Sequence, residues 1–84
     1  MDSDGFSVRI GEAHRLMIPI ECRRRLDLKP AQIYDITIVS SDRMVKENFL
    51  AKLHSSGRVV IPKLVYETRK FAKGQLLTVY VSTE

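Results

Sequence analysis

The chain has 84 residues, of which 44% are hydrophobic and 29% charged, and its formal net charge is +4. This length fits one small domain and excludes a multidomain enzyme. No apolar run approaches the ~20 residues that cross a bilayer, and the chain begins with an acidic stretch, so we expect a cytoplasmic protein with neither a membrane span nor a secretory signal.

Cysteine and histidine are scarce. The single cysteine, Cys22, permits no internal disulfide. His14 and His54 are far apart in the sequence, which disfavours a structural zinc site. We therefore expect no metal and no cofactor, with Cys22 as a small core residue and both histidines in surface turns.

Positive charge is concentrated in the second half of the chain. Residues 1–42 contain six basic and seven acidic side chains, whereas residues 43–84 contain eight basic and three acidic ones. A basic domain of this size suggests a polyanion as partner, although a net charge of +4 is weak evidence by itself.

The first half has the pattern of two strands, a helix and a third strand. Apolar and polar residues alternate over the first strand, as in a half-buried β-strand. Pro19 ends the second strand, because proline donates no ladder hydrogen bond, and its fixed φ suits the start of a helix. The expected elements are, in chain order, strands at 6–10 and 16–18, a helix at 20–26 and a strand at 33–39.

The second half repeats the first at an offset of 43 residues and without a gap. Arg15 and Ile18-Pro19 fall on Arg58 and Ile61-Pro62. The corresponding elements are strands at 48–53 and 58–61, a helix at 63–70 and a strand at 76–82. Two β-β-α-β repeats, at approximately 6–39 and 49–82, are too few for a solenoid and predict one closed domain over residues 1–84 with pseudo-twofold symmetry.

The repeated motif resembles the DNA-binding domain of the AbrB/MazE/SpoVT-like family of prokaryotic regulators. The segment Ser56–Lys63, with the sequence S-G-R-V-V-I-P-K, is similar to the family's core motif, and Arg15 to Glu21 gives a weaker copy. The resemblance covers nearly the whole chain, from about Phe6 to Ser82. It implies a mainly β cradle-loop barrel with two short helices, built as a swapped-hairpin pseudo-dimer within one chain, as in the tandem MraZ-like arrangement. Local closure of each half, as in RIFT-like barrels, stays open.

Three departures separate the two halves. His14 stands where the second half has Gly57, and Ala31 stands where it has Gly74. The Arg23-Arg24 pair becomes Tyr66-Glu67, so the basic helix is not duplicated. We therefore expect either an asymmetric binding site or a homodimer of chains that restores the symmetry.

The resemblance implies that the protein is a transcriptional regulator that binds double-stranded DNA through basic side chains of both repeats. By position, the implied DNA-binding residues are Arg9, Arg15, Arg23, Arg24, Lys52 and Arg58. The residues favour this independently, because Arg15 and Arg58 each begin a strand after a turn, where a guanidinium can reach phosphate or guanine edges. Ion pairs of these arginines with Glu12 or Glu21, and a merely solvated helix face, are the structural alternatives.

Other functions fit the sequence less well. We expect no enzymatic activity, because no catalytic triad, paired carboxylates or glycine-rich phosphate loop is present. The alternative function is an antitoxin-type or protein-interaction barrel without sequence-specific DNA binding of its own. An antitoxin of this kind uses a C-terminal tail, and the last predicted strand ends two residues before Glu84.

Overall fold

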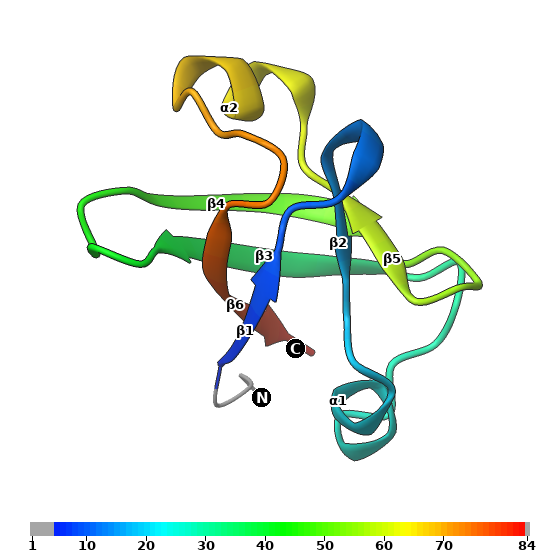
Figure 1. Ribbon diagram of the computed structural model, residues 1–84. Helices are drawn as coiled ribbons and strands as arrows, with labels where there is room; N and C mark the ends of the chain where they lie inside the picture. Colours follow the sequence, from blue (N-terminus) through cyan, green and yellow to red (C-terminus); the bar gives the residue numbers. More distant parts are fainter. Residues whose placement is uncertain (1–4, 84) are drawn as a thin grey trace.

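The computed structural model describes residues 5–83, so the acidic start at 1–4 lies outside the described residues. These residues form a mainly β domain with two short α-helices, as predicted (Figure 1). The elements are β1 (Phe6–Arg9), a 3₁₀ turn η1 (Glu12–His14), β2 (Arg15–Met17), α1 (Ile20–Arg25), β3 (Ile33–Ser40), β4 (Lys46–Lys52), β5 (Arg58–Val60), α2 (Lys63–Thr68) and β6 (Leu76–Ser82).

The strands form two antiparallel sheets that exchange strands between the repeats. The larger sheet has the order β1-β6-β3-β4, and β2 pairs with β5 in a separate two-stranded sheet. The first strand of each repeat therefore pairs with the last strand of the other repeat. Every strand pairing in the two sheets joins one strand of each repeat.

The strand registers have pseudo-twofold symmetry. In the smaller sheet, Leu16 lies opposite Val59, its counterpart 43 residues later. In the larger sheet, Thr37 lies opposite Tyr80, which is again 43 residues later. Both central pairs therefore lie on one approximate twofold axis, and residues on either side of it occupy equivalent places in the two repeats.

The core lies between the inner faces of the two sheets. Because side chains alternate along a strand, every second residue points inward. The fully buried side chains include Leu16, Ile18, Val59 and Ile61 from the smaller sheet and its extensions, and Ile36, Ile38, Leu77, Val79 and Val81 from the larger sheet. The pairing within residues 5–83 leaves two separate sheets, so closure into one barrel stays a prediction.

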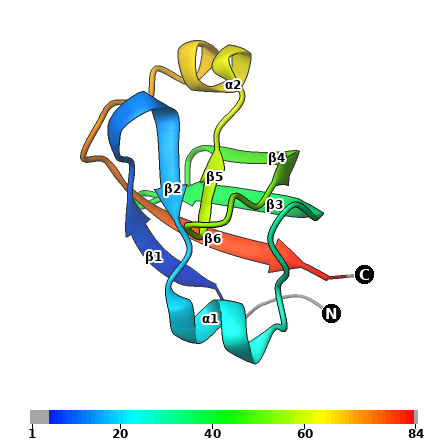
Figure 2. The same ribbon diagram turned by 90° about the vertical axis from the view of Figure 1, so that its right-hand side faces the viewer.

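The two helices lie at opposite ends of the domain (Figures 1 and 2). Cys22 of α1 is buried, as expected for a small core residue. Both helices end earlier than predicted, because Asp27 and Lys70 adopt a left-handed conformation with φ of 55°. The N–H groups of Leu28 and Phe71 then close each end by bonding to carbonyl oxygens five residues back, a helix-terminating motif that the sequence pattern does not reveal.

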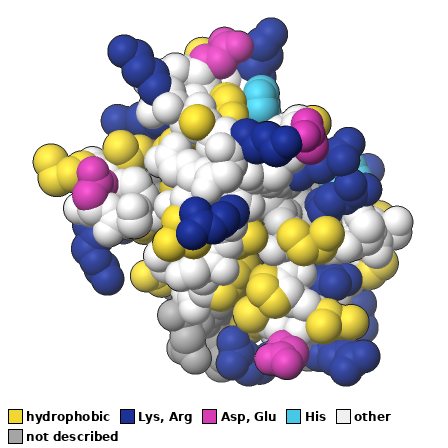
Figure 3. All heavy atoms as spheres, in the orientation of Figure 1, with side chains coloured by type: hydrophobic (Ala, Val, Ile, Leu, Met, Phe, Trp, Pro, Cys, Tyr) yellow, Lys and Arg dark blue, Asp and Glu magenta, His cyan; other side chains and the backbone are white. Residues whose placement is uncertain are grey.

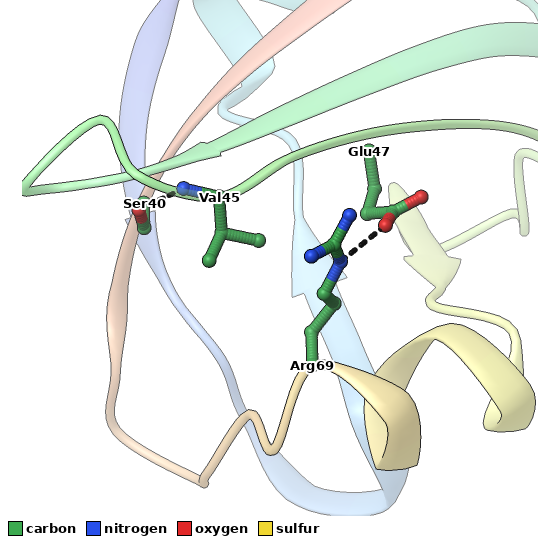
Figure 4. A network of polar contacts seen from close by, with 4 residues as sticks. All are labelled: Ser40, Val45, Glu47 and Arg69. Atoms are coloured by element: carbon green, nitrogen blue, oxygen red, sulfur yellow. Dashed lines mark hydrogen bonds and ion pairs between the residues drawn. The ribbon is translucent and has the colours of Figure 1, made fainter.

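The connection between β3 and β4 is a hairpin closed by polar contacts (Figure 4). The amide of Val45 donates to Ser40 Oγ over 3.0 Å, and the amide of Ser40 donates to the carbonyl of Val45 over 2.9 Å. Arg69, just after α2, forms an ion pair with Glu47 of β4. On the hairpin side, β3 and β4 therefore both extend further than predicted. The ion pair of Arg69 with Glu47 ties β4 to the α2 end of the domain.

None of the helices formed by residues 5–83 is long and apolar enough to cross a membrane.

Candidate nucleic-acid interface

The outer face of the two-stranded sheet presents the arginines at its centre. Leu16 and Val59 point into the core, so their neighbours along the strands point outward. Arg15 lies opposite Val60, and Arg58 lies opposite Met17. The two arginines thus lie diagonally across adjacent strands on one face and are related by the pseudo-twofold axis.

Neither of these arginines forms an ion pair with a carboxylate within the described part of the chain. Arg58 Nε donates to Ser56 Oγ over 2.7 Å, which leaves its terminal nitrogens for other partners. Glu12, one of the acids considered for such a pair, contacts Lys73 instead. The hydrogen bond and charge of Lys73 hold the pKa of Glu12 below its usual value, with a smaller contribution from Arg15.

Arg23 of α1 lies against the turn that precedes β5. Its Nε donates to the carbonyl oxygen of Ile18 over 3.0 Å. A Cβ atom placed on Gly57 would lie 2.4 Å from Cζ of Arg23, so the guanidinium rests on the glycine itself. Gly57 also has a φ of 87°, a conformation that other residues adopt at a cost. Glycine at this position therefore avoids the cost of the positive φ and leaves room for the close approach of Arg23.

Two adjoining hollows bring four of the six predicted residues together around residues 54–57. One hollow, of about 420 Å³, is lined by Arg15 and Arg58 together with His54, Ser55 and Ser56. The other, of about 290 Å³, is lined by Arg23 and Arg24 and shares His54 and Ser55 with the first. Figure 3 shows Lys and Arg side chains gathered along its right-hand side, where Figure 1 places β5 and the turn before it.

Arg9 and Lys52 are exposed at the ends of the two edge strands and do not line these hollows. Arg9 Nη1 donates to the carbonyl oxygen of Gly74 over 2.9 Å, which places it beside the turn after α2. Lys52 occupies the equivalent place at the other end of the domain, where the amide of Leu53 bonds to Gln32 beyond α1. The structure therefore brings Lys52, but not Arg9, to the α1 end.

A third hollow, of about 750 Å³, lies on the outer face of the larger sheet and was not predicted. Its lining includes Asp35, Asn48 and Tyr80, with Arg43 and Lys46 at the β3–β4 hairpin. Between residues 5 and 83, no group of three or more His, Cys, Asp or Glu side chains is placed to hold a metal ion.

The sequence patterns missed the contact of Arg23 with Gly57. The available signal was that positions 14 and 57 differ between the repeats and that positions 23 and 66 differ as well. These two changes belong to one contact, because each helix packs on the turn of the opposite repeat.

Comparison with known proteins identifies the fold but no family. No protein-family model matches the chain, and no curated protein matches it. Among solved structures, the chain is similar to the solution structure of PHS018 from Pyrococcus horikoshii, with a TM-score of 0.81 and 21% sequence identity. The match covers 93% of this chain and 87% of the other. At this identity the likeness shows a shared fold.

Proposed function

We propose that this protein is a double-stranded DNA-binding transcriptional regulator of the AbrB-like type, with no enzymatic activity. The observation that carries the proposal is the placement of Arg15 and Arg58 on one outward face without a carboxylate partner in the described residues. Guanidinium groups in such a position are suited to bidentate contacts with phosphates or guanine edges.

The surroundings of these two arginines support the same function. Arg23 and Arg24 flank them across the shared turn, and serine hydroxyls at 55 and 56 supply further donors. Clustered cations with small polar neighbours are typical of surfaces that contact the phosphate backbone. With about six cations in contact with phosphates, the affinity for DNA would fall on the order of a thousandfold between 50 and 200 mM salt.

The strand exchange supports the finer assignment of the fold. The first strand of each repeat pairs with the last strand of the other repeat, and we propose that this exchange is the swapped-hairpin arrangement of the AbrB-like family. We propose that the two packed sheets are this family's barrel, formed by one chain. The exposed side chains of Ile33 and Leu50, at 64% and 68% exposure, instead favour the alternative of a protein-interaction barrel.

The test of DNA binding is the double variant Arg15→Ala with Arg58→Ala. The salt slope is the fall in the logarithm of the DNA-binding constant per unit of log[salt], and loss of two phosphate contacts reduces it by about 1.8. Between 50 and 200 mM salt, the fold loss of affinity should therefore be about 12 times smaller for the variant than for the native protein. The measurement is a gel-shift titration on a random duplex pool at both salt concentrations, with the melting temperature measured in parallel.

The matched control is Arg43→Ala with Lys46→Ala, which removes the same charge from the outer face of the larger sheet. The assignment of DNA binding to this face is refuted if the Arg15/Arg58 variant keeps its melting temperature and binds DNA like the native protein, or if the control loses as much affinity. Absence of duplex binding by the native protein at 50 mM salt refutes DNA binding itself. Light scattering on the same samples distinguishes one bound chain from a homodimer.

A further inference from the structure

The two ends of the domain have equivalent backbone hydrogen bonds, although Ala13 has a φ of 54° and its counterpart Ser56 has no positive φ. At the α1 end, the amide of Ile18 donates to the carbonyl oxygen of Gly57 over 2.9 Å. At the α2 end, the amide of Ile61 donates to the carbonyl oxygen of His14 over the same distance. Each helix thus follows a strand that is tied to the turn of the opposite repeat, and positions 14 and 57 have equivalent places and positive φ values.

The side chains that meet at the two helix–turn contacts differ. Where Arg23 lies on Gly57, the α2 end has Tyr66 stacked on His14, with ring centroids 3.7 Å apart and ring planes at 17°. Each member of the contact is replaced in the other repeat. The small turn residue accompanies a guanidinium at one end, and the large turn residue accompanies an aromatic ring at the other.

The contact at the α1 end prepares a guanidinium to bind an anion. Arg23 Nε donates a hydrogen bond to the carbonyl oxygen of Ile18, whereas the terminal nitrogens of Arg23 make no hydrogen bond or ion pair to any residue in the range 5–83. A planar guanidinium held in this way loses little further entropy on binding phosphate. Arg24 lines the same hollow, and so does Asp27, whose carboxylate forms an ion pair with Lys29.

The contact at the α2 end offers no such group. The counterpart of Arg23 is the uncharged Tyr66, and the counterpart of Arg24 is Glu67, whose carboxylate repels phosphate. The His14 ring is stacked on Tyr66, whereas at the α1 end Arg23 lies directly on the backbone of Gly57. The α2 end therefore lacks the guanidinium pair of the α1 end, although Lys63 and Lys70 stand there in place of Ile20 and Asp27.

We propose that the chain holds duplex DNA in a single orientation, with a phosphate bound by Arg23 and Arg24 at the α1 end and none bound at the equivalent place beside His14 and Tyr66. This inference rests on the proposed function and adds to it the direction of the bound DNA. One chain then engages an asymmetric site, although its backbone has pseudo-twofold symmetry.

A gain-of-function variant tests the inference. The double variant His14→Gly with Tyr66→Arg rebuilds the α1 contact at the α2 end and should add one phosphate contact. Its salt slope should be steeper than that of the native protein by about 0.9, which is an additional 3.5-fold loss of affinity, roughly, between 50 and 200 mM salt. Tyr66→Arg alone is the control, because the His14 side chain then still separates the new guanidinium from the turn backbone. The inference is overturned if the double variant keeps the native slope or if the single variant gives the whole increase.

Directed cleavage of the DNA gives a second readout. With Cys22→Ala as background, an iron chelate is attached to Ser55→Cys in one protein and to Glu12→Cys in another, since these exposed positions are equivalent in the two repeats. On an end-labelled duplex with one binding site, hydroxyl radicals from position 55 should cleave at one end of the site and those from position 12 at the opposite end only. Cleavage at both ends from a single position overturns the single orientation, whereas a native protein that binds no duplex at low salt refutes the proposed function itself. Circular dichroism confirms that each variant is folded.

Discussion

Replacing Leu16 with alanine tests how the two-stranded sheet is held on the domain. No strand pairing within residues 5–83 joins β2 or β5 to the larger sheet, so packing of side chains must hold the two sheets together. Leu16 is fully buried at the centre of this packing, opposite Val59. Removing its branched end deletes buried apolar contacts and leaves a cavity, which in protein cores lowers the free energy of unfolding by about 3 kcal/mol.

That loss is large for a domain of this size. A chain of 84 residues has a free energy of unfolding of about 4–13 kcal/mol, so Leu16→Ala should remove a quarter or more of it and lower the melting temperature by roughly 12–24 °C. Urea unfolding followed by circular dichroism measures the change. Met17→Ala is the control, since this neighbouring side chain points outward and is 46% exposed. A loss below about 1 kcal/mol for Leu16→Ala, or an equal loss for both variants, would contradict the described packing.

Three further changes test individual contacts. Tyr66→Ala removes the ring stacked on His14 and should lower the free energy of unfolding by about 1 kcal/mol in urea titrations, and an unchanged midpoint would contradict this. The hydrogen bond from the Ser40 hydroxyl is the main cause of the lowered pKa of Asp42. The stability from this contact is therefore present above the unfolded pKa of the carboxyl group and is lost as pH falls through the folded pKa. Ser40→Ala should raise the Asp42 pKa in an NMR titration, and an unchanged pKa would refute this. Ala31 has a φ of 69° where the second repeat has glycine, so Ala31→Gly should stabilise the fold by about 0.5–1 kcal/mol, and a lower melting temperature would count against it.

Local sequence patterns predicted the elements but not their partners. The sequence predicted a strand at 33–39, and β3 covers Ile33–Ser40. The same pattern says nothing of which strand lies beside it, because pairing of β3 with β4 and β6 depends on contacts distant in sequence. Helix ends were also missed, because Asp27 and Lys70 stand where glycine usually marks a left-handed helix end.

The candidate site was predicted position by position and not as contacts. The departure of His14 from the glycine at 57 was visible in the sequence. The structure shows a positive φ at His14 together with a stacked Tyr66, which stabilises the ring in that place. Only the folded chain shows that the residues at positions 14 and 66 contact each other, because the two positions belong to different repeats.

The exchange of β1 and β4 between the repeats makes the two halves of the chain depend on each other. A fragment ending in the β3–β4 hairpin would contain β1 and β3 but neither of the neighbours that lie between and beside them in the larger sheet. Such a half has no complete sheet to form alone, so folding must be cooperative across the whole chain. The same half could complete its sheets only with a second polypeptide, and the linked chain fixes as a permanent intramolecular pairing what two separate copies would have to achieve by association.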